Sequence, residues 1–121
     1  MTLAQEERPW GSWHVIDEDA GYKIKRLHVK PGNRLSLQSH RHRSEHWVVV
    51  HGTALCHVDG TVVAASPGDS VDVPVGARHR LENPGPEPLL IVEVQRGSYT
   101  GEDDVVRLED DYGRVAQATQ H

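Results

Sequence analysis

The sequence predicts an all-β protein folded as an antiparallel sandwich or barrel. Short runs rich in β-forming residues follow one another along most of the 121 residues, and turn-forming residues separate them. Asp59-Gly60 lies between two such runs, and this dipeptide is the strongest short-range signal of a β-hairpin. No segment keeps the apolar period of a helix. Regularly spaced short strands without helices are typical of sandwiches and barrels.

Most of the expected strands end at a turn signal. The first, 22–30, alternates apolar residues with lysine and histidine and ends at Pro31-Gly32. The second, 34–42, is mostly polar, and the third, 45–51, ends at Gly52. The remaining strands are expected at 53–58, 61–65, 71–73, 79–83 and 89–95. The charged segment from Arg107 is expected to be either a strand or the end of a helix.

The chain is expected to be one domain, 1–121, because its length suits a single core. The core should extend over about 8–107, with a flexible tail over about 115–121. Since the sequence has no Phe, that core must rest on Val, Leu, Ile and Ala. Cys56 is the only cysteine and lies in an apolar run, so we expect a buried, inert thiol.

Charge and hydropathy argue against several classes of protein. The net charge of −5 gives no support for non-specific nucleic-acid binding. No apolar run approaches the length of a membrane span, and the first residues lack the pattern of a secretory signal. We therefore expect a cytoplasmic protein with no nucleic-acid or membrane partner. Arg34, Arg41 and Arg43 lie beside a histidine cluster, which suits a small anionic ligand.

Donor atoms for a metal cluster on one predicted strand. Because side chains alternate along a strand, one face of 34–42 carries Arg34, Ser36, Gln38, His40 and His42. This face has no apolar residue, which indicates the lining of a pocket rather than a core wall.

Two further donors complete a possible metal site. Glu45, if it faces inward, comes within reach of Gln38 and His40, and His79 follows a Pro74-x-Gly76 turn that can deliver it from a distant strand. An amide oxygen, two imidazoles and a carboxylate suit a divalent Zn, Mn, Fe, Co or Ni ion. Four protein ligands usually leave an open position at which chemistry can occur.

The spacing of these residues resembles the two sequence motifs of cupins. Gly32-x5-Gln38-x-His40-x4-Glu45-x6-Gly52 resembles the first motif, with a glutamine where many cupins have a first histidine. Gly68-x5-Pro74-x-Gly76-x2-His79-x3-Asn83 resembles the second. The resemblance implies a double-stranded β-helix, or jelly-roll barrel. It also implies one divalent metal ion held by Gln38, His40, Glu45 and His79, with His42 outside the ligand set.

A closer resemblance covers roughly 6–114. Segments such as Arg8-Pro-Trp-Gly-Ser-Trp13, His42-Arg-Ser-Glu-His-Trp47 and Gly101-Glu-Asp-Asp104 are similar to the C-terminal cupin domain of bifunctional mannose-1-phosphate guanylyltransferase/mannose-6-phosphate isomerases. The resemblance implies a metal-dependent isomerase that interconverts mannose 6-phosphate and fructose 6-phosphate. The Gly-rich start of the guanylyltransferase domain is absent from this sequence, so that activity is not expected. Ser39 and Arg41 depart from the family beside the pocket and bear on sugar specificity.

Aldose–ketose isomerisation needs a base that moves a proton between C2 and C1 of the sugar. Glu93 is one candidate, a carboxylate in an apolar strand that either faces inward or lies at an edge. His42 is the other, one repeat beyond His40, although a strand-end histidine in solvent would have the same spacing. Phosphate binding is expected from basic groups near the ligands, because arginine offers bidentate geometry. These groups are Arg34, Arg43, Arg80 and Lys25.

Other functions on the same frame remain open. One is a free-sugar isomerase or epimerase, a second is a non-catalytic cupin that binds metal or sugar, and a third is an iron-dependent dioxygenase. Trp10, Trp13 and Trp47 are expected in the core or at a dimer interface, with sugar stacking as the alternative. The expected partners are a small sugar phosphate and a second copy of the chain, because sheet edges favour a homodimer.

Overall fold

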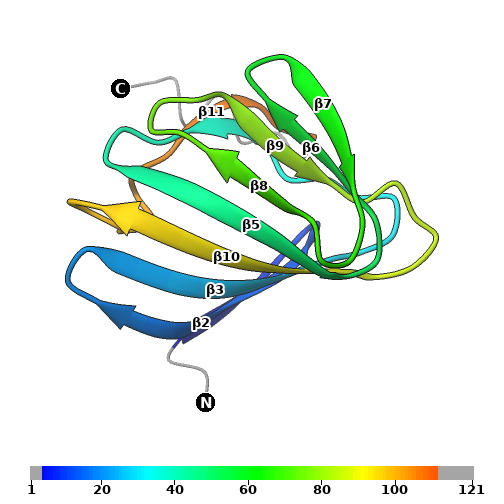
Figure 1. Cartoon of the computed structure of the whole chain (residues 1–121), viewed down its shortest axis with the longest axis horizontal. Helices are drawn as coiled ribbons and strands as arrows, with labels where there is room; N and C mark the ends of the chain where they lie inside the picture. Colours follow the sequence, from blue (N-terminus) through cyan, green and yellow to red (C-terminus); the bar gives the residue numbers. More distant parts are fainter. Residues whose placement is uncertain (1–3, 112–121) are drawn as a thin grey trace.

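Two antiparallel sheets face each other and enclose a barrel-like interior (Figure 1). The structure is a computed structural model that describes residues 4–111. The predicted frayed tail at 115–121 lies outside the described residues. Within 4–111 there is no helix, and hence none long and apolar enough to cross a membrane.

The larger sheet has six strands in the order β1-β2-β3-β10-β5-β8. Their bounds are Ala4–Arg8, Gly11–Asp19, Tyr22–Val29, Leu89–Gly97, Arg43–His51 and Ser70–Val73. The smaller sheet has five strands in the order β11-β4-β9-β6-β7. These are Val106–Glu109, Leu37–Ser39, His79–Glu82, Ala54–Val58 and Thr61–Ala65.

The interior is apolar at its centre and charged beside it. Buried apolar side chains from both sheets form one cluster, and its largest members are Trp10, Trp13, Trp47, Leu27, Leu81, Leu89 and Ile91. The predicted burial of Cys56 is confirmed. The three tryptophans are buried, as expected for core residues. On β3, however, the inner face carries Lys23 and Lys25 rather than the half-buried Ile24.

Two turns show why the sequence requires glycine there. Asp59 and Gly60 both have positive φ, 48° and 84°, as the tight turn between β6 and β7 requires. At Gly52 φ is +85°, and an added Cβ would lie 2.6 Å from the Pro88 carbonyl oxygen. Glycine is therefore needed at Gly52 both for its backbone conformation and for the close approach of another strand.

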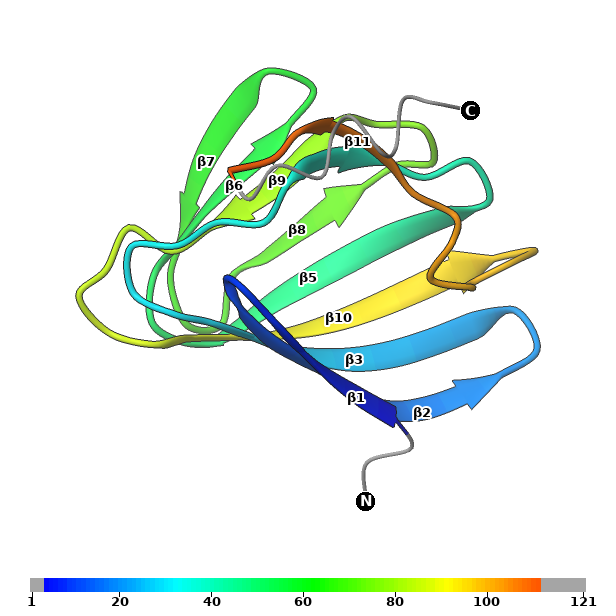
Figure 2. The ribbon, with the colours of Figure 1, turned by 180° about the vertical axis from the view of Figure 1, so that it is seen from behind.

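The N-terminal strands were not predicted. β1 and β2 form a hairpin at the edge of the larger sheet, where β1 crosses the end of the barrel (Figure 2). Strand β1 is charged and exposed, so it lacks the apolar alternation by which strands are recognised. The segment 98–105, which leads from β10 to β11, runs along an open side between the two sheets (Figure 2).

The predicted strand 34–42 is mostly wrong. Only Leu37–Ser39 forms a regular β-strand, and Arg34 makes an isolated β-bridge with Glu82. Leu35 and Ser36 both line the interior cavity, so strict alternation fails before β4. After β4 the main-chain N–H groups of Arg41 and His42 donate to the Asp104 carboxylate, at 2.9 Å each, instead of continuing a ladder.

Candidate metal centre

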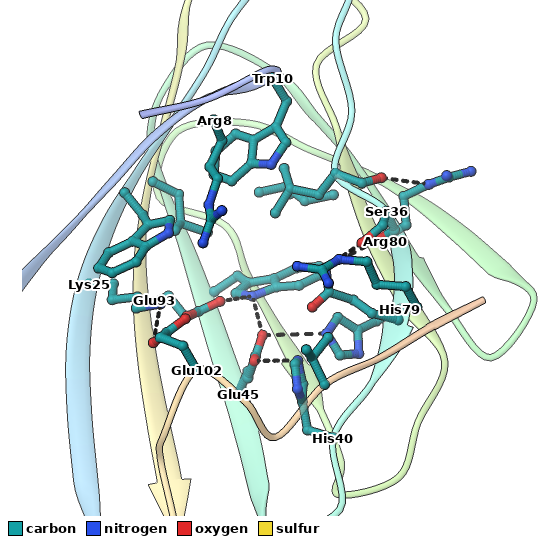
Figure 3. Close-up of a pocket in the computed structure, with 18 of the residues that line it drawn as sticks. Arg8, Trp10, Lys25, Ser36, His40, Glu45, His79, Arg80, Glu93 and Glu102 are labelled. Carbon is teal, nitrogen blue, oxygen red and sulfur yellow. Dashed lines mark hydrogen bonds and ion pairs between the residues drawn. The ribbon is translucent and has the colours of Figure 1, made fainter. Parts of the chain in front are cut away.

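A cavity between the two sheets gathers most of the predicted functional side chains (Figure 3). The atom-free space in this cavity and at its mouth is about 670 Å³, and this figure includes open solvent. The larger sheet contributes Lys25, Glu45, Trp47 and Glu93, while the smaller sheet and its neighbouring loops contribute Gln38, His40, His79 and Arg80. Polar side chains thus meet apolar ones from the core in one concave site, as in most binding sites for small molecules.

His40 follows the end of β4, and the main chain of a distant loop sets its orientation. Its Nδ1 donates to the carbonyl oxygen of Asp104. The Nε2 atom therefore carries the lone pair, and it lies 3.1 Å from Glu45 Oε2. The Nη2 group of Arg43 donates to the same Nε2 at 3.2 Å, which is consistent with this tautomer.

His79 begins β9 and is oriented in the same way. Its Nδ1 donates to the carbonyl oxygen of Ala77 at 3.0 Å, which leaves Nε2 facing Glu45 Oε1 at 3.6 Å. The two imidazole rings lie 4.8 Å apart between their centroids. A backbone carbonyl on the far nitrogen is the usual partner of a metal-ligating histidine, because it fixes the tautomer and the ring plane.

These residues fit a divalent metal. The ligand atoms of His40, Glu45 and His79 all lie within 4.8 Å of one another, and all three side chains are buried. Imidazole nitrogens and a carboxylate oxygen that accept without donating need a donor or cation near them, and here Arg43 donates to both His40 Nε2 and Glu45 Oε2, at 3.2 and 3.0 Å. Ligands about 2.0–2.2 Å from one ion would stand at comparable mutual distances.

Gln38 lies beside this group. It pairs directly with His79 across β4 and β9, and it lines the same cavity. Its amide nitrogen donates to Ser36 Oγ at 2.8 Å, so its amide oxygen is the atom that it can offer to an ion. The structure thus brings His40, Glu45 and His79 together and places Gln38 on the lining of the same cavity.

The charges of the ligands also suit a cation. Burial raises the pKa of Glu45, but His40, His79 and Arg43 outweigh it and hold this pKa well below its ordinary value. Burial lowers the pKa of His79, while the charge of Glu45 opposes this shift. A metal requires an ionised carboxylate, which is the form that the lowered pKa of Glu45 favours.

Glu93 faces inward, next to the ligands. Its Oε2 accepts a hydrogen bond from Trp47 Nε1 at 3.1 Å, and its Oε1 accepts one from Gln95 Nε2 at 2.7 Å. The same indole N–H lies 3.2 Å from Glu45 Oε1, so Trp47 bridges the two carboxylates. Burial first, and then the Glu45 charge, raise the pKa of Glu93 to about 8, while Lys25 opposes this rise.

Two predicted residues lie away from the cavity. Arg34 is half-exposed and forms a two-pronged ion pair with Asp111, at 2.8 and 2.9 Å. His42 is exposed, and its ring packs edge-on against Tyr99 instead of sharing the face of His40. The prediction that Arg34 and His42 share the ligand face is therefore wrong. It assumed a regular strand over 34–42, whereas β4 spans only Leu37–Ser39.

The other predicted substrate residues line the cavity and already have protein partners. Arg43 donates to Glu45 through Nε at 3.0 Å. Arg80 donates to the Leu35 carbonyl oxygen at 2.8 Å and pairs with Glu109 at 3.4 Å. Lys25 reaches Glu102 at 2.7 Å.

Sequence reasoning missed several residues of this site. Arg8 on β1 and Glu102 on the 98–105 segment both line the cavity. Asp104 holds His40 by its main chain and the neighbouring loop by its carboxylate. None of the three lies near the ligands in sequence. The available signals were the matches of Arg8-Pro-Trp-Gly-Ser-Trp13 and Gly101-Glu-Asp-Asp104 to the family, without any role attached.

Solved structures with the same architecture define the class of protein. A double-stranded β-helix protein from Klebsiella pneumoniae subsp. pneumoniae MGH 78578 has a TM-score of 0.69 and 28% identity, covering 79% of this chain and 77% of that one. An RmlC-like cupin from Shewanella frigidimarina NCIMB 400 has a TM-score of 0.73 and 22% identity, covering 83% and 86%. The chain is therefore a cupin.

The family follows from the sequence match. A family model described as the mannose-6-phosphate isomerase C-terminal domain matches residues 2–110, and the chain belongs to this family. The mannose-1-phosphate guanylyltransferase ManC of Salmonella typhimurium is 55% identical over 108 residues, which cover 89% of this chain and 22% of that protein. The alginate biosynthesis protein AlgA of Pseudomonas aeruginosa is 52% identical over 110 residues, or 91% and 23%. The chain thus spans less than a quarter of the length of these relatives.

Proposed function

We propose that this cupin is a metal-dependent aldose–ketose isomerase that interconverts mannose 6-phosphate and fructose 6-phosphate. One observation carries the proposal. In a member of this family, two imidazoles held by backbone carbonyls and one carboxylate converge beside a second, buried carboxylate in a single cavity. The convergence supplies a ligand set and, next to it, a group able to carry a proton.

The ligands would be Gln38, His40, Glu45 and His79, and the ion would be divalent Zn, Mn, Co, Ni or Fe. When bound, such an ion supplies Lewis-acid polarisation of the sugar's carbonyl and hydroxyl oxygens. The carbonyl groups of Asp104 and Ala77 keep the two imidazole rings aimed at Glu45. They thereby preorganise the site for the ion.

Glu93 is the residue to which we assign proton transfer between C2 and C1. It lines the cavity, and donors on both of its oxygens hold its carboxylate plane in place. Trp47 keeps Glu93 one indole N–H away from Glu45, so the proton carrier stays next to the ligands without replacing one of them. We do not assign the transfer to His42, because its exposed side chain is outside the cavity lining.

A coupled assay tests the proposal. Purified protein is treated with chelator, reloaded with each of the five ions, and given mannose 6-phosphate, free mannose or free lyxose. We expect fructose 6-phosphate to form only with metal, and its formation to be lost in His79→Ala and Glu93→Gln. His46→Ala is the matched control, since His46 lies on β5 but pairs with Asp72, away from the cavity lining. No turnover with any ion would favour a non-catalytic binding protein instead.

One observation favours a second candidate, a free-sugar isomerase or epimerase. Two of the most deeply buried cations of the cavity already have carboxylate partners: Lys25 pairs with Glu102, and Arg80 pairs with Glu109. A phosphate group would have to compete with these partners, whereas a neutral sugar would not. Turnover of free mannose or lyxose without turnover of mannose 6-phosphate would move the assignment to this candidate.

A further inference from the structure

Two buried lysines lie side by side on the inner face of β3, and one of them, Lys25, lines the cavity. Lys23 and Lys25 occupy successive inner positions of β3, and their side chains are only 7% and 4% exposed. A lysine is rarely buried to this extent unless it is paired, because its ammonium group loses its hydration. The pair therefore marks a position where the fold maintains positive charge away from water.

The carboxylate of Glu102 lies against both ammonium groups. Its Oε2 is 2.7 Å from Lys25 Nζ and 3.1 Å from Lys23 Nζ. Glu102 comes from the 98–105 segment rather than from a strand, and it lines the cavity together with Lys25. Its side chain is 36% exposed, so it is the solvent-accessible member of the cluster.

The lysines are held in place by contacts other than Glu102. Lys25 Nζ stands over the Trp13 ring, 4.0 Å from its centroid. Lys23 Nζ donates to the Thr100 carbonyl oxygen at 2.6 Å and lies 3.6 Å from Glu18. Removing the Glu102 carboxylate would therefore leave two positioned cations, whose burial needs another anion to balance it.

The lysines also lie at a suitable distance from the ligands. Lys25 pairs with Glu93 across β3 and β10, and Glu93 pairs with Trp47 across β10 and β5. The next row along the same three strands runs Lys23, Gln95 and Glu45. Two strand spacings of about 4.8 Å separate the ends of each row. This span is comparable with an open-chain hexose 6-phosphate from its carbonyl end to its phosphate.

We propose that Glu102 is a built-in counter-ion, which the phosphate group of the substrate replaces at Lys23 and Lys25. The inference rests on the proposed function and adds the place at which phosphate binds. A phosphate dianion carries more charge than a carboxylate and offers more acceptor oxygens to two ammonium groups. During this exchange the two buried ammonium groups keep an anionic partner, because phosphate takes the place of the Glu102 carboxylate. Glu102 then determines how strongly the cavity prefers phosphorylated over free sugars.

Calorimetric titration of the full chain with inorganic phosphate tests the proposal. We expect Glu102→Gln to bind phosphate at least about fivefold more tightly than the wild type, since one competing charge-assisted contact is lost. Glu18→Gln is the matched control, because Glu18 is more exposed and lies 3.6 Å from Lys23, whereas Glu102 is 3.1 Å from Lys23 and 2.7 Å from Lys25; it should change phosphate affinity much less than Glu102→Gln. Lys25→Gln should weaken binding by about tenfold or more. Glu102→Ala repeats the test if Glu102→Gln does not fold.

The outcomes separate this proposal from the proposed function. Unchanged or weaker phosphate binding in folded Glu102→Gln and Glu102→Ala would overturn the counter-ion role, even if the wild type isomerises mannose 6-phosphate. Tighter phosphate binding without isomerase activity in the wild type would support the anion site and contradict the isomerase. Where activity is present, Glu102→Gln should lower the KM for mannose 6-phosphate relative to the KM for free mannose.

Discussion

Asn83→Ala is expected to be among the most destabilising single changes in this chain. The Asn83 side chain is 1% exposed at the end of β9. Its Nδ2 donates to the carbonyl oxygens of Val29 at 2.9 Å and Glu87 at 2.8 Å, and its Oδ1 accepts from the N–H of Gly85 at 2.8 Å. The amide thus joins the end of β3 to the turn that leads into β10.

The magnitude follows from the three hydrogen bonds. At about 1 kcal/mol each, their loss lowers the free energy of unfolding by about 3 kcal/mol. Unpaired buried backbone groups and the lost packing raise the cost to roughly 3–4 kcal/mol. For a chain of this size, the melting temperature should then fall by roughly 10–15 °C.

Urea unfolding followed by tryptophan fluorescence measures this loss, because Trp10, Trp13 and Trp47 are all buried. The control is Asn33→Ala, whose amide donates to Pro31 near solvent and should cost less than about 1 kcal/mol. If Asn83→Ala also costs less than about 1 kcal/mol, the side chain does not join these segments as argued.

Four other predictions follow from the same contacts. Removal of metal by a chelator should lower the melting temperature. Adding back the bound ion at about 100 times its Kd should raise the free energy of unfolding by about 2.7 kcal/mol, and no shift with any of the five ions would contradict the metal site. Burial raises the pKa of Cys56 to about 11, so thiol reagents should modify it only after unfolding; fast modification of the native protein would contradict its burial. Burial raises the pKa of Glu102, but Lys25 outweighs it and the net shift is downward. The wild type should therefore have a larger free energy of unfolding than Glu102→Gln, and this difference should be complete above the pKa of about 4.3 that Glu102 has in the unfolded chain. The difference should disappear as the pH falls through the lower pKa that Glu102 has in the folded protein. A difference that does not depend on pH would contradict the ion pair. We also propose a homodimer, with Val62 and Val63 exposed on the uncharged edge strand β7 as its contact; light scattering should show a monomer after Val62→Lys and Val63→Lys if β7 is the interface.

The sequence predicted those parts of the structure that depend on local pattern. Apart from 34–42, the strands between Tyr22 and Gln95 were expected close to their observed bounds, because turns such as Asp59-Gly60 separate them. Gln38, His40, Glu45 and His79 were expected to share one site because of the spacing of two motifs. The structure groups His40, Glu45 and His79, although Glu45 comes from β5 of the other sheet. Cys56 was expected to be buried because its neighbours are apolar.

The remaining parts depend on contacts between residues far apart in sequence. The strand 34–42 was expected to be continuous, but Asp104 satisfies the N–H groups of Arg41 and His42 and ends it. The carbonyl group that orients His40 also belongs to Asp104, 64 residues away along the chain. No local pattern shows which loop returns to a ligand, so the orientation of His40 was not predicted, and the exposure of His42 was only one of the two alternatives left open.

The three central strands of the larger sheet divide the interior into two regions. At one end of β3, β10 and β5, the inner positions are charged or polar, namely Lys23, Lys25, Gln95, Glu93, Arg43 and Glu45. At the other end they are apolar, namely Leu27, Val29, Ile91, Leu89, Trp47 and Val49. Well-packed apolar residues at the charged end would often be as stable or more stable, because burying ion pairs costs desolvation. The fold therefore relies on the apolar end for its stability, while the charged end holds the proposed ligands, the proposed proton carrier and the two buried lysines.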